Sequence, residues 1–256
     1  AVLYVIAFML GAVVCQGSAV AEGDCPEWLL PRSSLEKLLI ESPTGLFPDF
    51  YSSPVFPFVI DSTEQTVRIE LKEMTAVQAQ HVLDKNFEEN PSAVFLVHVT
   101  GTIRVSSAPL SLHDRTCMVL GKDAQFVATA GCAADSLLRV LDGEYVSITG
   151  SYDPRENSIS GQEGMFRGNG VVRNGIRIDA SGRIHLDRIS VTGCKDVGVS
   201  ITGRGSEQYD NAVSLTRSVV SKCQGDGVRV SQSPACIVLD SRITSVAKAA
   251  VVIDSP

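Results

Sequence analysis

Two aspartates occupy similar places in two similar stretches of this chain. Asp196 lies in ISVTGCKDVGVSITG and Asp226 lies in SVVSKCQGDGVRVSQ, offset by one position. Hydrolysis of a glycosidic bond requires two carboxyl groups about 5 to 9.5 Å apart. If the two stretches form adjacent coils, strand spacing puts the two backbones about 6 Å apart. Asp196 and Asp226 are therefore the predicted catalytic pair, with stabilisation of a tight turn beside glycine as the alternative role for both.

Two arginines in the same region point to an acidic ligand. Arg177 and Arg229 alternate with apolar residues, so both should project from one outer face, about 10 Å apart. They could hold an acidic sugar chain, and Asp179, Ser231 and Asp254 should project beside them as further substrate-binding residues. Asp179 and Asp254 would lie about 14 Å apart, which is too wide for a catalytic pair. A solvated surface position is the alternative for both arginines.

No metal site is predicted. The sequence contains no CxxC motif or Cys/His cluster that could hold zinc. The predicted outer face carries no cluster of three carboxylates, so a calcium site is unsupported and no cofactor is predicted. A lyase would need a base beside the sugar carboxylate and an arginine or a calcium ion to neutralise the developing charge. His81 falls in a predicted helix, while His98, His113 and His185 are isolated in the sequence and are expected in the core or at the surface.

The candidate side chains require a scaffold that repeats. Stretches in register begin at Phe166, Ile189, Ser218 and Ser241, at intervals of 23, 29 and 23 residues. The longer interval contains the polar stretch GRGSEQYDNA, which predicts a surface loop. Two of the three apolar columns lie two residues apart, as the inward face of a strand requires. The columns are Val171/Cys194/Cys223/Val246, Ile176/Val199/Val228/Val251 and Ile178/Ile201/Val230/Ile253.

This interval indicates either a leucine-rich repeat or a parallel β-helix. The leucine-rich signature is absent, and both segments of each copy are rich in β-branched residues. Gly198 and Gly227 fall between the two segments, where a bend suits a residue without Cβ. The pattern therefore predicts a parallel β-helix, in which like residues stack about 4.8 Å apart.

Six cysteines follow Ala21, an even number that would suit disulfides in an exported protein. Cys194 and Cys223, however, share a column with valine. Because cysteine behaves as a small apolar residue in protein cores, buried free thiols are favoured over a bridge for this pair.

The region before the repeats extends the pattern. MTAVQAQHVLDKNFEENPSA predicts a short amphipathic helix with Val77, His81 and Val82 on one face, and TVRIELKEM could add a strand before it. VFLVHVTGTIRV follows as a run of strand residues broken by Gly101. With the repeats, this order resembles the pectin-lyase-like right-handed parallel β-helix superfamily over about residues 75–256.

The resemblance implies a fold and a class of ligand. The fold is all-β, a right-handed single-stranded parallel β-helix with a short N-terminal capping helix. Members often bind a polysaccharide in a groove beside one stacked sheet, and the enzymes among them include hydrolases and lyases of uronic-acid polymers. Against the motifs of the polygalacturonase-type hydrolases, Asp226 matches the second of the paired aspartates, while Asn174 stands where Asn-Thr-Asp would end. The Gly-His-Gly and Arg-Ile-Lys motifs have no match.

Composition and the two ends of the sequence set the context. The 256 residues are 44% hydrophobic, which suffices for a sizeable core, and a net charge of −7 argues against nucleic acid as a partner. Residues 1–21 form a predicted signal peptide, clipped at its start, with an uncleaved membrane anchor as the alternative. A Pro-containing segment follows at 22–74, and the strand pattern runs so close to Pro256 that the coil is expected to continue.

The sequence therefore predicts a secreted protein, extracellular or periplasmic, with no membrane span after signal cleavage. Its β-helix binds an extracellular acidic polysaccharide and, as a lyase or glycoside hydrolase, could cleave it. The alternative function is that of a non-catalytic cell-surface or adhesion module.

Overall fold

The computed structural model describes residues 66–121, 123–150, 165–179, 182–203, 213–232, 236–239 and 241–254. The predictions for residues 1–21, for most of 22–74 and for nearly all of the loop GRGSEQYDNA fall outside these ranges. Within them, no helix has both the length and the apolar character needed to cross a membrane.

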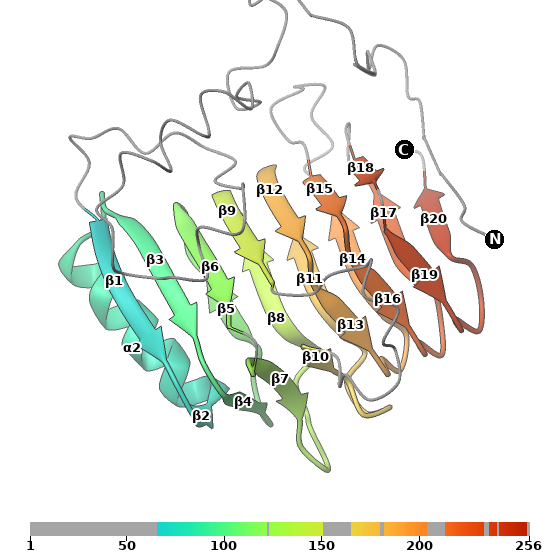
Figure 1. Ribbon diagram of the computed structural model, residues 1–256, viewed down its shortest axis with the longest axis horizontal. Helices are drawn as coiled ribbons and strands as arrows, with labels where there is room; N and C mark the ends of the chain where they lie inside the picture. The colour runs from blue at the N-terminus through green and yellow to red at the C-terminus, as the bar shows by residue number, and fades with distance from the viewer. Residues whose placement is uncertain are drawn as a thin grey trace, which may run out of the picture.

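The described chain is built almost entirely from parallel strands in three sheets, here named A, B and C (Figure 1). Sheet A consists of β1 (Thr66–Leu71), β3 (Val94–Val99), β6 (Thr116–Leu120), β9 (Glu144–Thr149), β12 (Gly182–Asp187), β15 (Val213–Thr216) and β18 (Cys236–Leu239). Sheet B consists of β2 (Met74–Thr75), β4 (Thr102–Val105), β7 (Gln125–Ala128), β10 (Phe166–Arg167), β13 (Ser190–Thr192), β16 (Val219–Ser221) and β19 (Arg242–Thr244). Sheet C consists of β5 (Leu110–Leu112), β8 (Ser136–Leu141), β11 (Asn174–Asp179), β14 (Val197–Thr202), β17 (Val228–Ser231) and β20 (Val251–Asp254).

The chain visits the sheets in the order A, B, C and then returns to A, so each circuit adds one strand to each sheet. We call one such circuit a coil. The first circuit differs, because the helix α2 (Ala76–Glu89) follows β2 in place of a strand of sheet C. The predicted all-β, parallel arrangement is confirmed.

Two of the predicted columns stack in sheet C. Val199 pairs with Val228, and Val228 pairs with Val251 on the next strand. The second column, Ile178 to Ile253, is in the same register. Both columns extend further back than the sequence alignment reached, since Ile176 pairs with Leu138 and Leu138 with Leu110. The result is a line of aliphatic side chains through six strands.

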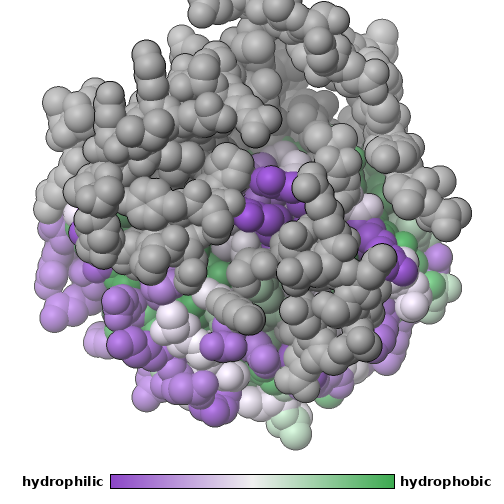
Figure 2. Space-filling view, in the orientation of Figure 1, coloured by the Kyte–Doolittle hydropathy of each residue, from purple (hydrophilic) through white to green (hydrophobic). Residues whose placement is uncertain are grey.

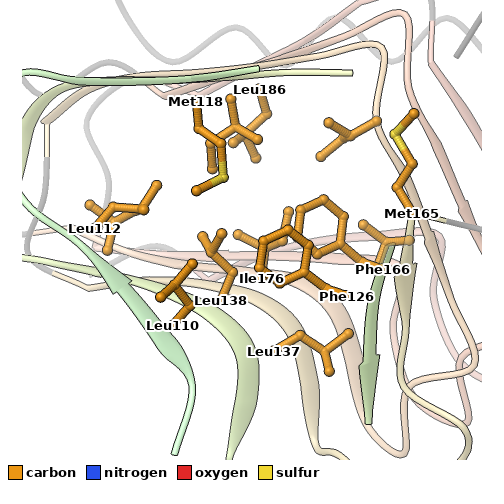
Figure 3. Close-up of a cluster of buried hydrophobic side chains, with 14 of the residues drawn as sticks. Leu110, Leu112, Met118, Phe126, Leu137, Leu138, Met165, Phe166, Ile176 and Leu186 are labelled. Atoms are coloured by element: carbon orange, nitrogen blue, oxygen red, sulfur yellow. The ribbon is translucent and has the colours of Figure 1, made fainter. Parts of the chain in front are cut away.

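These columns meet inward-facing side chains of sheets A and B in one core. Figure 3 shows Leu110, Leu138 and Ile176 of sheet C directed toward Met118 and Leu186 of sheet A. In sheet B the rings of Phe126 and Phe166 stack with centroids 4.9 Å apart. Burial of apolar surface, at roughly 25 cal/mol per Å², is the main term that holds the coils together.

The third predicted column is wrong at one position. Val171 is 37% exposed, whereas Val172 is fully buried and its carbonyl accepts the Lys195 N–H at 2.8 Å, beside Cys194. The turn between β10 and β11 spans residues 168–173, but the equivalent turn in the next coil spans only 193–196. This turn has two additional residues, which shift the local alignment. A constant interval therefore assigns Val171, and not Val172, to the column position of Cys194.

Gly198 and Gly227 do lie where the chain enters sheet C, but not because of a special backbone angle. The positive-φ glycines among the described residues are Gly101, Gly131, Gly170 and Gly193. A Cβ added at Gly198 would lie 2.2 Å from Cγ1 of Val220 and 2.7 Å from the Gly227 carbonyl. Close packing between coils therefore requires glycine here.

The predicted helix is present, with a different buried face. Thr75 caps it, because its hydroxyl accepts the Gln78 N–H and the Gln78 side chain accepts the Thr75 N–H. Ala76, Ala79 and Leu83 are buried, whereas Val77 is 53% exposed. The helix packs against β2, β4 and β5, and small alanines allow this close approach. Figure 2 shows mostly hydrophilic residues over α2 at the left of the view.

Candidate functional site

The outer face of sheet C brings the predicted binding residues into two adjacent rows. We call these two rows the polar ladder. One row runs Ser111, Arg139, Arg177, Ser200, Arg229 and Val252 along successive strands. The other runs Asp179, Thr202, Ser231 and Asp254. Asp179 and Asp254 lie three strands apart in this register, the wide separation that the sequence predicts.

Four charged side chains form a first cluster. Arg139 lies on β8, Arg177 and Asp179 lie on β11, and Asp135 directly precedes β8. Asp179 accepts hydrogen bonds from Nε of Arg139 at 3.2 Å and from Nε of Arg177 at 3.0 Å. Arg177 also donates through Nη1 to Asp135. Burial opposes ionisation of Asp135, but the Ser136 hydroxyl and Arg177 outweigh it and lower the pKa of this carboxyl. The cluster is a chain of ionised pairs.

Asp135 and Arg139 were missed by the sequence analysis. The aligned repeats begin at Phe166, although LRV at 138–140 has the same apolar–arginine–apolar order as IRI at 176–178. Extending the alignment back by one coil would have placed Arg139 directly before Arg177.

A second cluster surrounds Arg229 and includes the predicted catalytic pair. Nε of Arg229 donates to Oδ2 of Asp226 at 3.1 Å, and Nη2 of the same arginine lies 3.9 Å from Oδ1 of Asp196. Asp226 Oδ1 accepts the Ala249 N–H at 3.1 Å. Asp196 and Asp226 therefore face one guanidinium group, in the turns that enter sheet C in adjacent coils.

The environment of Asp226 favours its charged form. Its side chain is only 5% exposed, and burial alone would raise the pKa. The Ala249 N–H and the Arg229 guanidinium outweigh that effect and lower the pKa of Asp226 below its usual value. A general acid must hold its proton at the working pH, which usually requires a raised pKa. The geometry suits a base or a turn-stabilising role for Asp226 and does not suit an acid.

Hydroxyl groups lie between the two charged clusters. Ser200 stands between Arg177 and Arg229 in one row, and Thr202 stands beside it in the other. The Ser231 hydroxyl contacts the Thr202 hydroxyl at 3.4 Å. An uncharged strand, β14, thus separates the two charged clusters along the axis of the coils.

A second polar cluster, not predicted from the sequence and largely buried, lies on strands β12 and β15 of sheet A. Nδ1 of His185 and Oγ of Ser214 share a hydrogen bond of 2.6 Å. Burial lowers the pKa of His185 to about 4, with Asp187 opposing and Arg217 adding to the shift. Asp187 is fully buried and accepts hydrogen bonds from Thr216 and from two nitrogens of Arg217. His185 and Ser214 are 29 residues apart, the longer repeat interval, which was the signal that could have paired them.

His113 is not isolated either. Its Nε2 lies 2.8 Å from Oδ1 of Asp84 in α2, and its ring stacks on Phe87 with centroids 4.2 Å apart. These contacts fasten the helix to the turn after β5, which indicates a structural role.

The described cysteines are free thiols, as predicted for Cys194 and Cys223. Both are buried, and each lies within a turn that leads into sheet C. The Gln224 N–H donates to the Cys194 carbonyl at 2.9 Å, so the two backbones are neighbours.

Within the described ranges, no three His, Cys, Asp or Glu side chains gather closely enough to hold a metal ion. Comparisons with family models, with curated proteins and with solved structures found no match to this chain.

Proposed function

We propose that the polar ladder binds an extracellular polysaccharide and that this chain is a secreted β-helix of the pectin-lyase-like type. The observation that carries the proposal is the register of the ladder. Arginine, serine and aspartate side chains recur on successive strands of one flat face, in step with the spacing of about 4.8 Å between strands. A linear polymer laid along the coils meets a new polar group at each step.

The arginines are held ready for such a ligand. Side chains of Arg139, Arg177 and Arg229 are 29%, 35% and 34% exposed, and each donates to at least one aspartate. The aspartates fix the orientation of each guanidinium group before a ligand arrives. Such preorganisation lowers the entropy lost on binding, and the exposed edge of each arginine can donate to sugar hydroxyl or carboxylate oxygens.

An acidic polysaccharide is the proposed ligand class because guanidinium groups match carboxylates in a two-point geometry. The neighbouring aspartates offset most of the positive charge, and the whole chain carries a net charge of −7. Binding of the polysaccharide should therefore depend on directed hydrogen bonds more than on net charge. Binding that weakens only modestly with added salt would agree with this picture.

The hand of the coil and the role of α2 belong to the same proposal. Parallel strands joined by a crossover in one sheet connect with a right-handed sense in about 98% of cases. The helix adds Ala76, Ala79 and Leu83 to the core beside β2, β4 and β5. Such a helix would shield apolar side chains and strand edges at the start of the coil.

Binding without cleavage is the second candidate, and the ion pairs favour it. Asp226 and Asp196 both face Arg229, and the lowered pKa of Asp226 argues against a general-acid role for it. A non-catalytic surface or adhesion module needs only the ladder. Incubation with uronic-acid polymers, followed by assays for new reducing ends and for ultraviolet absorbance of unsaturated products, separates the two candidates.

The test of binding is a variant of the ladder with a matched control. Arg177→Gln should weaken binding to an acidic polymer about tenfold, the value of one charged hydrogen-bonded contact. Asp179 keeps Arg139 as its partner, so folding should survive. Arg104→Gln removes an arginine that is paired with Glu73 on sheet B and should leave binding unchanged. Equal affinity in all three proteins would reject the ladder as the binding surface.

A further inference from the structure

The cationic groups of the polar ladder are unevenly spaced along the coil axis. Arg139 and Arg177 lie on neighbouring strands and converge on the carboxylate of Asp179, so their guanidinium donors form one position, here called a basic position although Asp179 and Asp135 offset its net charge. The next strand presents only the hydroxyls of Ser200 and Thr202 at this face. Arg229, on the strand after that, forms a second basic position.

We propose that the polar ladder recognises two acid groups two sugars apart, with a neutral sugar between them facing Ser200. This inference rests on the proposed function and specifies its ligand. Arg177 and Arg229 are two strands apart, a distance of about 10 Å. A pyranose in an extended chain advances by about the distance between neighbouring strands. Carboxylates on the first and third sugars of a bound segment therefore lie opposite the two basic positions.

The middle position discriminates against a second, adjacent acid. A carboxylate on the central sugar would face Ser200, whose one hydroxyl donor replaces the two-point contact of a guanidinium group. It would also lose part of its hydration without gaining an opposite charge. A neutral sugar at the same place can both donate to and accept from the Ser200 and Thr202 hydroxyls.

The two basic positions differ in what surrounds them. Arg177 is supported by Asp135 and Asp179, of which Asp135 is partly exposed. Arg229 is supported by the nearly buried Asp226 and by Asp196, with Arg173 within 3.9 Å of Asp196. In both places the guanidinium is ion-paired, and its side chain stays about one-third exposed, 35% for Arg177 and 34% for Arg229. Both can therefore receive an acid group of the ligand.

The experiment uses three-sugar probes in competition with a labelled acidic polysaccharide. One probe carries carboxylates on its first and third sugars, and the other carries them on its first and second sugars. The spaced probe should compete about fivefold to tenfold better, because only it meets both basic positions.

A gain-of-function variant sharpens the test. Ser200→Arg supplies a guanidinium at the middle position and should raise competition by the adjacent-acid probe severalfold. Ser200→Gln adds a long side chain without charge and should not. Circular dichroism and unfolding curves check that both variants retain the fold.

The outcomes separate this inference from the proposed function. If the polysaccharide binds but the two probes compete equally, or neither competes, the spacing is overturned and the binding function stands. If neither the polysaccharide nor the probes bind to the unaltered protein, the binding function itself is rejected and the spacing with it.

Discussion

Nδ1 of His185 lies 2.6 Å from Oγ of Ser214 on the adjacent strand of sheet A. This buried pair sits beside the fully buried Asp187, whose carboxylate is held by Arg217 and Thr216. Because a buried imidazole resists protonation, this pair makes the free energy of unfolding depend on pH.

Protonation of His185 should destabilise the fold in mildly acidic solution. Its pKa is about 4 in the folded chain, against about 6.5 when exposed. The unfolded chain therefore binds more protons between these values, and the free energy of unfolding falls as the pH drops from about 6.5 to 4. The full loss is about 3 kcal/mol. Urea unfolding of the native protein and of His185→Asn at pH 7, 5 and 4 measures it.

The variant should lose most of this dependence because asparagine does not titrate. His81→Asn alters an exposed helix residue and serves as the control. Identical pH profiles for the native protein and His185→Asn would contradict the assignment.

Asp226 should contribute more to stability than Asp196. Asp226 is nearly buried against Arg229 and accepts the Ala249 N–H, while Asp196 is 27% exposed and 3.9 Å from that arginine. Asp226→Asn should lower the free energy of unfolding by about 2 to 4 kcal/mol, and Asp196→Asn by less than about 1 kcal/mol. Denaturant unfolding at pH 7 compares them. Equal, small effects would show that the Asp226 pair adds little, and a parallel turnover assay reports any catalytic loss.

The loss in Asp226→Asn should also depend on pH. The folded pKa of Asp226 is depressed, so its stabilisation is present above the unfolded value of about 3.9 and disappears as the pH falls through the folded value. The native protein and Asp226→Asn should therefore converge in stability only in strongly acidic solution, well below the window assigned to His185.

Replacing Cys194 or Cys223 by valine should change the free energy of unfolding only slightly. Val172 occupies the equivalent slot one coil earlier, and both cysteines are buried free thiols. We expect each cysteine-to-valine change to cost less than about 1.5 kcal/mol, whereas Cys194→Ser buries a hydroxyl and should cost about 1 to 3 kcal/mol more. Unfolding curves under reducing conditions compare the variants. If the serine variant is as stable as the valine variant, the position of Cys194 does not require an apolar side chain.

Gly198→Ala should be among the most damaging small changes in the chain. The added methyl would lie 2.2 Å from Val220 and 2.7 Å from the Gly227 carbonyl, so the coils would have to separate. A loss of more than about 2 kcal/mol is expected. Gly131→Ala meets open space and carries only the strain of its φ of +73°, about 1 kcal/mol, so a thermal melt of both variants isolates the steric effect.

The stacked columns could be predicted from the sequence because residues that stack on paired strands recur at a regular interval along the chain. Val199, Val228 and Val251 recur at fixed places, and period-two alternation identifies the side that faces the core. The same alternation distinguished Arg177 and Arg229, which face outward, from the buried isoleucines and valines on either side of each arginine.

Other features depend on geometry that a fixed interval does not contain. Two additional residues in the turn before β11 made Val171 look equivalent to Cys194. The buried face of α2 was misjudged because alanines, not the larger Val77, approach the strands most closely. The His185–Ser214 pair lies on sheet A, outside the aligned stretches, so only its spacing of 29 residues, the longer repeat interval, pointed to it.

The unequal turns before β11 and β14 indicate where this fold tolerates insertions. The strand register from Asn174 to Asp179 is retained although its preceding turn is longer by two residues. Corner length and core pairing are thus uncoupled at this turn, so residues inserted there can leave the stacked strands in register.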